Sequence, residues 1–212
     1  MTQEIATEID RQLDVLVGKG YPALAGLGEG EFRALADPVR VAAADVVPAA
    51  PSEQQVTFLL VTTRDVVPAE DAMPLTTLLG STKPGVVDRN HGDGDLAGYL
   101  PIDAVRLPAA RLYALVDVER GEEFCDVRPQ DALPVVLGRG RTPLTIDEGV
   151  ALVTQFPQVL QTNRCFMLSG SRRHDKRVPA LWIGQGAPKL GWCWDGNPHS
   201  WLGTASVGRR LG

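Results

Sequence analysis

Near the start of the chain, apolar residues recur at helical spacing. They repeat every three or four positions between acidic residues, at Ile5, Ile9, Leu13 and Leu16. This pattern predicts an amphipathic helix that ends near Gly18–Gly20, with its apolar stripe against a core. A second, short helix is expected from Glu29 to Ala36. The Ala- and Pro-rich stretch 42–52 then predicts a connector.

The middle of the chain alternates between strand and helix patterns. Val56 to Thr63 is an uncharged run of mostly β-prone residues and predicts a buried strand. Arg111 to Glu119 alternates in its second half and predicts another strand. Residues 65–99 are rich in Pro and Gly and predict irregular structure, which is often functional at such length. Helices are expected at 129–137 and from Ile146 to Phe156, the second behind a capping box formed by Thr145 and Glu148.

The last fifty residues read as a β-meander. Strands are expected at 165–169, 178–183, 190–194 and 199–205, with a basic loop at 171–176 and a turn at 195–198. The predicted fold class is α+β, with N-terminal helices on a mixed sheet and a C-terminal antiparallel β-meander. We expect a single domain overall, in which residues 1–50 are an N-terminal helical segment and residues 51–212 are the α+β core.

Composition narrows the class of protein. Of 212 residues, 44% are hydrophobic and 22% charged, as in ordinary soluble proteins. The three cysteines lack CxxC spacing, which favours reduced thiols in the cytoplasm. The N-terminus lacks the pattern of a secretory signal, and no apolar run approaches the roughly 18 residues of a membrane span. We therefore expect a cytoplasmic protein that does not enter the membrane.

Charge is distributed unevenly. Residues 164–212 carry eight Lys and Arg against two Asp, a surplus of six, whereas residues 1–163 carry 13 basic and 24 acidic residues, a deficit of eleven. The net charge is −5. Such asymmetry indicates an anion-binding surface, or a basic end that simply neutralises the acidic remainder.

All four tryptophans lie between positions 182 and 201. Strand alternation sends Trp192 and Trp194 to one face, and Trp201 can join them across a hairpin. A row of indoles is a stacking platform for a base or another flat group. The alternative is that these tryptophans belong to the core.

The loop from Ser169 to Arg177 combines hydroxyls, a glycine and four permanent positive charges, although the order of a P-loop is absent. It is either an anion site or a solvated hairpin tip. With the tryptophans and the nearby histidine it defines the candidate ligand-binding residues: Ser171, Arg172, Arg173, His174, Lys176, Arg177, Trp192, Trp194, His199 and Trp201.

Other chemistry has weaker signals. Ser171 with His174, or a cysteine with a histidine, permits a nucleophile–base pair, but no nucleophile elbow is present. A zinc set of Cys165, His174, Cys193 and His199 matches no standard spacing. The segment 88–95 begins like a calcium loop and then departs from that pattern. This favours a polar turn with an exposed His91 and leaves a different calcium or magnesium arrangement as the alternative. No metal, no cofactor and no catalytic residue is assigned.

Two stretches carry a resemblance to a known family. They are 128–149, with Arg139-Gly140-Arg141-Thr142-Pro143-Leu144, and the tail 179–198, with Gly191-Trp192-Cys193-Trp194-Asp195-Gly196-Asn197-Pro198. Together they resemble an uncharacterised family of roughly 200-residue actinobacterial proteins, a domain of unknown function. The resemblance covers most of the chain and implies a soluble bacterial cytoplasmic protein. It brings no activity and no cofactor.

The leading hypothesis is a binding module for an anionic, partly planar ligand, either a nucleotide or nucleic acid. The acidic net charge favours a small ligand or a local site over an extended groove. Two alternatives stay open. One is a small-molecule enzyme with His174 or His199 as acid or base, and the other is a protein-interaction or structural module.

Overall fold

The computed structural model describes residues 2–92 and 94–212 and has the α+β class that the sequence predicts. Its α-helices are α1 (Gln3–Gly18), α2 (Tyr21–Leu24), α3 (Glu29–Ala34), α4 (Asp37–Ala42), α5 (Ala69–Ala72), α6 (Pro129–Gly138) and α7 (Ile146–Gln155). Short 3-10 helices are η1 (Met73–Leu75), η2 (Asp95–Gly98), η3 (Glu122–Phe124) and η4 (Pro157–Val159). None of the helices in this part of the chain has both the length and the apolar character needed to cross a membrane.

The described strands form three sheets. A four-stranded sheet has the order β1-β4-β11-β5, a five-stranded sheet has the order β10-β6-β8-β9-β2, and β3 pairs with β7 alone. The strands are β1 (Gln55–Thr62), β2 (Val86–Val87), β3 (Leu100–Pro101), β4 (Leu112–Glu119), β5 (Thr142–Pro143), β6 (Cys165–Met167), β7 (Ser171–Arg172), β8 (Arg177–Gly184), β9 (Ala187–Trp194), β10 (Leu202–Thr204) and β11 (Ser206–Leu211).

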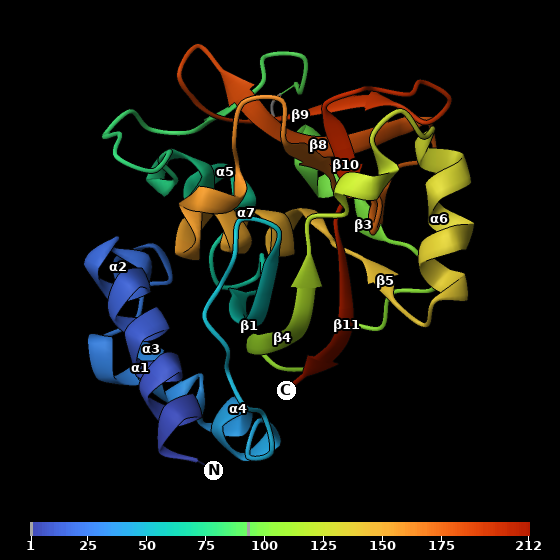
Figure 1. Ribbon diagram of the computed structural model, residues 1–212. Coiled ribbons are helices and arrows are strands. Elements are labelled where there is room, and N and C mark those ends of the chain that lie inside the picture. The colour runs from blue at the N-terminus through green and yellow to red at the C-terminus, as the bar shows by residue number, and fades with distance from the viewer. Residues whose placement is uncertain (1, 93) are drawn as a thin grey trace.

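The N-terminal helices lie beside β1, an edge strand of the first sheet (Figure 1). The predicted apolar stripe of α1 is buried, and so is one polar residue within it, Gln12. Its amide donates to the Phe58 carbonyl at 2.9 Å and accepts from the Leu60 amide at 2.7 Å. Gln12 therefore completes the backbone hydrogen bonds that an edge strand leaves open.

The start of helix α7 is bound to the last strand of the chain by a buried ion pair. Thr145 caps it, and Glu148 closes the predicted capping box. Glu148 is fully buried and accepts two hydrogen bonds from Arg210 on β11, at 2.6 and 2.9 Å. A buried carboxylate needs such a partner, so this pair ties the start of α7 to the last strand.

The C-terminal strands differ from a simple meander in one respect. Strands β6, β8 and β9 pair antiparallel as expected. The fourth predicted strand instead returns as β10 and runs parallel to β6, with Leu202 opposite Cys165. The chain then enters the other sheet as β11. The β8–β9 hairpin lies at the top of Figure 1 and carries Trp182, Trp192 and Trp194 together with the end of the basic loop.

Candidate functional site

Three arginines of the basic loop converge on aspartates. Arg172 at the end of β7 contacts Asp195 at 2.8 Å. Arg173 and Arg177 both contact Asp95, which comes from the irregular segment before β3. These ion pairs are only partly exposed, because the three arginine side chains retain between 15% and 24% of their accessible surface. Carboxylates therefore hold the basic loop in place, and its positive charge is largely compensated.

Two tryptophans stand beside these arginines. Trp192 and Trp194 project from the same face of β9, with ring centroids 4.9 Å apart and planes at 70°. The Arg177 guanidinium lies over the Trp192 ring, 5.1 Å from its centroid, as in a cation–π contact. Trp194 pairs with Arg177 across the hairpin and is 46% exposed. We call Arg172, Arg173, Arg177, Trp192 and Trp194 the hairpin site.

Trp201 lies outside the hairpin site. It packs edge-on against Trp182 at 6.3 Å and beside His199 at 5.4 Å. Trp182 is paired with Lys189 across the hairpin, and alternation puts both on the face opposite Trp192. The four indoles thus form two separate pairs, and the expected row of Trp192, Trp194 and Trp201 is not formed.

The remaining candidates divide by burial. His174 and Lys176 are exposed at the tip of the loop. Ser171 is fully buried, and its hydroxyl accepts a hydrogen bond from the Ile146 amide at 3.0 Å. Ser171 therefore accepts the hydrogen bond of a backbone amide at the start of α7. Its burial gives no support to a role as a nucleophile with His174 as the base. His199 is half-buried, and its Nε2 has no partner among the described residues.

The two cysteines near the tryptophans, Cys165 and Cys193, are buried. Burial raises the pKa of Cys193 to about 12 and also raises the pKa of Cys165. The reactive thiolate is therefore scarce at neutral pH. Within residues 2–92 and 94–212, no three His, Cys, Asp or Glu side chains are arranged to hold a metal ion, so the zinc set of Cys165, His174, Cys193 and His199 is not assembled. Asp93 of the calcium-like segment lies outside the described residues.

The segment before β3 places two residues beside the hairpin site that the sequence does not identify as candidates, His91 and Tyr99. His91, expected to be exposed, is 7% exposed and packs edge-on against Tyr99 at 5.6 Å. Its Nδ1 lies 3.8 Å from the Asp95 carboxylate that binds Arg173 and Arg177. Tyr99 in turn lies under the Arg173 guanidinium, 5.4 Å from it. Burial lowers the pKa of His91 and raises the pKa of Tyr99 to about 12, so both are uncharged at neutral pH.

Comparison with known proteins adds a family but no activity. A model of a family of unknown function, DUF5701, matches residues 15–212. No curated protein and no solved structure matches the chain significantly. Its chemistry must therefore be argued from its own side chains.

Proposed function

We propose that this chain, which belongs to the DUF5701 family of unknown function, is a binding module whose hairpin site holds a planar ligand with negative charge. The ligand class that best combines a flat ring with an anion is a nucleotide. One observation carries the proposal: the Arg177 guanidinium lies over Trp192, next to the exposed Trp194. Cationic and aromatic groups are thereby within reach of one small ligand.

Each part of a nucleotide has a counterpart in the hairpin site or in Lys176 beside it. The exposed Trp194 offers a ring on which a base can stack. The phosphates would meet the exposed Lys176 and the Arg172 guanidinium, which a phosphate can bind bidentately. Arg172 already contacts Asp195, so the phosphate must compete with that carboxylate. Arg173 and Arg177, both bound to Asp95, would hold the loop and the indoles in place.

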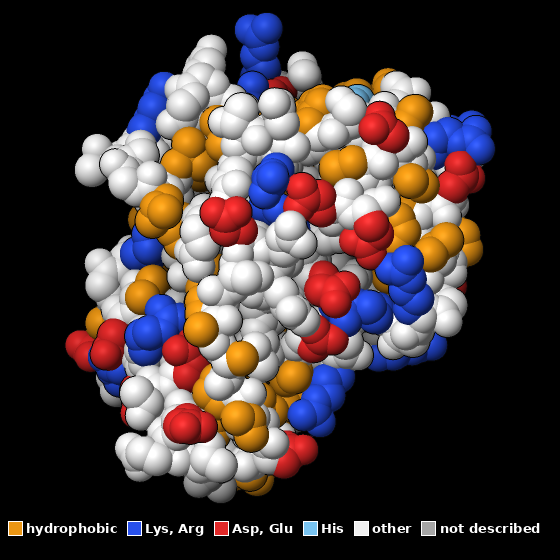
Figure 2. Space-filling view, in the orientation of Figure 1, with side chains coloured by type: hydrophobic (Ala, Val, Ile, Leu, Met, Phe, Trp, Pro, Cys, Tyr) orange, Lys and Arg blue, Asp and Glu red, His pale blue; other side chains and the backbone are white. Residues whose placement is uncertain are grey.

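The charge balance favours a small ligand over a nucleic acid polymer. Three of the four permanent cations at 172–177 are already paired with aspartates. A polymer needs several free cations to neutralise successive phosphates. On the face seen in Figure 2, basic and acidic side chains are interspersed and form no extended field of one sign. We also propose, from the sequence, that the protein is cytoplasmic and of actinobacterial origin.

The test is calorimetric titration with adenosine triphosphate, with adenosine and inorganic triphosphate as partial probes. We expect the nucleotide to bind more tightly than either part. Trp194→Ala should weaken binding roughly 5- to 150-fold, the equivalent of about 1–3 kcal/mol for a stacked base. Arg209→Ala, which removes an exposed arginine on β11, is the matched control and should leave affinity unchanged.

Asp195→Asn provides the sharper prediction. It removes the carboxylate that competes for Arg172, so nucleotide affinity should rise even if the fold becomes slightly less stable. If Arg172 were only a structural partner of Asp195, this change would lower stability and leave affinity unchanged. Equal binding of adenosine triphosphate by the wild type, Trp194→Ala and Arg172→Ala would refute the proposal.

A further inference from the structure

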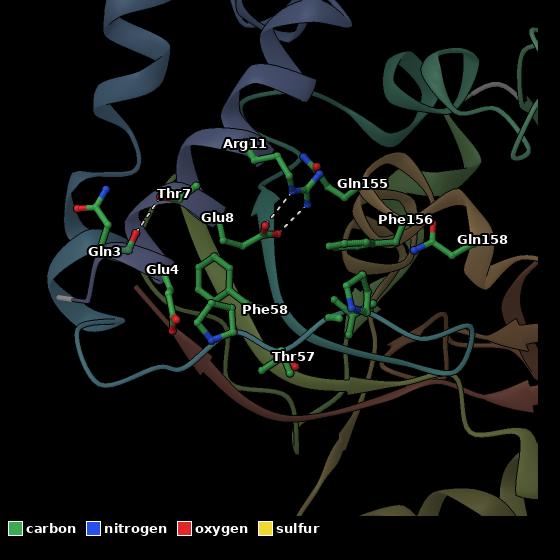
Figure 3. A pocket seen from close by; sticks show the side chains of 15 residues that line it. Gln3, Glu4, Thr7, Glu8, Arg11, Thr57, Phe58, Gln155, Phe156 and Gln158 are labelled. Carbon is green, nitrogen blue, oxygen red and sulfur yellow. Dashed lines mark hydrogen bonds and ion pairs between the residues drawn. The ribbon is translucent and has the colours of Figure 1, made fainter.

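A cavity lies beside the N-terminal helix α1, and its lining residues are distant in sequence from the hairpin site. It has a volume of about 720 Å³ and opens between the first turns of α1, the coil 48–51, the start of β1 and the end of α7 (Figure 3). Its apolar lining includes Pro48, Pro51, Phe58 and Phe156. Both the volume and the mixture of apolar walls with a few polar groups are typical of small-molecule sites.

One residue of the lining, Gln155, has a buried polar atom without a partner among the described residues. Gln155 is 6% exposed, and its amide nitrogen donates to the Gln12 carbonyl at 2.9 Å. A carbonyl can only accept, so the nitrogen must face Gln12 and the orientation of the amide is fixed. The amide oxygen of Gln155 then meets no hydrogen-bond donor within residues 2–92 and 94–212. A buried acceptor in this state favours a ligand that brings an N–H or O–H group.

Of the three charged side chains in the lining, Arg11 and Glu8 compensate each other, and Glu4 is exposed. Arg11 lies over the Phe156 ring at 5.1 Å and donates two hydrogen bonds to Glu8, at 2.7 and 2.8 Å. Both are drawn in Figure 3, where dashed lines join them. The Glu8 carboxylate also accepts from Gln12 at 2.7 Å, so its hydrogen bonds are supplied by the protein. A charged ligand would have to break this arrangement, whereas an uncharged aromatic ligand can pack against the Phe and Pro side chains.

We propose that this cavity is a second binding site, for an uncharged aromatic molecule that donates a hydrogen bond to the Gln155 amide oxygen. The site is distinct from the hairpin site in both place and chemistry. It uses apolar walls and one acceptor, whereas the hairpin site uses one exposed indole and cations.

The experiment compares two probes that differ in one group. N-Phenyl-1-naphthylamine carries a single N–H donor between its two aromatic parts, and 1-phenoxynaphthalene has an ether oxygen in its place. The first is followed by its fluorescence and the second by competition with it. We expect the wild type to prefer the amine by up to about tenfold, as one hydrogen bond provides.

Three variants locate the effect. Gln155→Leu should remove the preference and leave similar affinities for both probes. Thr7→Trp, at an exposed position of the α1 lining, should fill the cavity and prevent binding of both probes without disturbing the core. Gln54→Leu, an exposed glutamine outside the lining, is the matched control and should behave as wild type.

The proposal is overturned if the wild type binds neither probe, binds both equally, or keeps its preference in Gln155→Leu. Retained binding of both probes by Thr7→Trp also overturns it, because the probes would then bind elsewhere. These outcomes do not affect the nucleotide proposal, since none of the variants touches the hairpin site.

Discussion

His91 is a single side chain whose protonation is coupled to folding. Burial lowers its pKa below the ordinary value of 6.5, while Asp95 and Asp88 act in the opposite direction and Arg177 adds to the lowering. As the pH falls below about 6.5, the unfolded chain takes up a proton that the folded chain resists. The free energy of unfolding should therefore fall with pH in this range and level off below the folded pKa.

This prediction is checked by urea unfolding of the wild type and of His91→Phe at about pH 7 and pH 5.5, on either side of the ordinary histidine value. In the variant, the free energy of unfolding should fall much less between these two pH values, because the phenyl ring keeps the packing against Tyr99 and does not titrate. An equal decrease in both proteins would show that His91 is not its source.

At the scale of elements, the β8–β9 hairpin depends on a glycine. A β-carbon at Gly191 would lie 2.0 Å from the Trp182 ring, so this ring can cover the strand only where no side chain intervenes. Gly191→Ala should displace Trp182 and lower the free energy of unfolding by about 1–3 kcal/mol, as overpacking does. Denaturant unfolding measures this loss.

Gly30→Ala is the control for that substitution. Gly30 lies within α3, and a β-carbon there meets nothing within 4 Å. Alanine has the higher helix propensity, so this change should stabilise the protein by about 0.5–1 kcal/mol. If both substitutions had the same effect, close packing between Gly191 and Trp182 would not explain the first.

Elements governed by local sequence were predictable. The Thr145 capping box and the Ile/Leu stripe of α1 depend on neighbours a few residues away, and both are formed. Strand partners and ion pairs depend on contacts distant in sequence. Nothing in the neighbouring sequence predicts that β10 pairs parallel with β6. The same holds for the ion pairs of Asp95 with Arg173 and Arg177. For this reason the sequence identifies the basic loop but not its neutralisation, and it predicts an exposed His91.

At the scale of the whole molecule, one buried cluster extends from Ile5 on α1 to Val207 on β11. This continuity supports the proposal of a single domain, in which residues 1–50 unfold together with the core. The chain offers two independent probes, since its tryptophans all lie at 182–201 and the first helices lie at the other end. Tryptophan fluorescence and far-UV circular dichroism should therefore give coincident unfolding curves. Loss of helical signal ahead of fluorescence would indicate a separately unfolding N-terminal segment.

The most direct test of the nucleotide proposal observes the four indole N–H resonances in a ¹⁵N-labelled sample, assigned with single Trp→Phe variants. On addition of adenosine triphosphate, the signals of Trp192 and Trp194 should shift in a saturable way. The signals of Trp182 and Trp201, on the opposite face, should stay in place. Unchanged signals at all four positions, or shifts confined to Trp182 and Trp201, would contradict the assignment of the hairpin site as a nucleotide-binding surface.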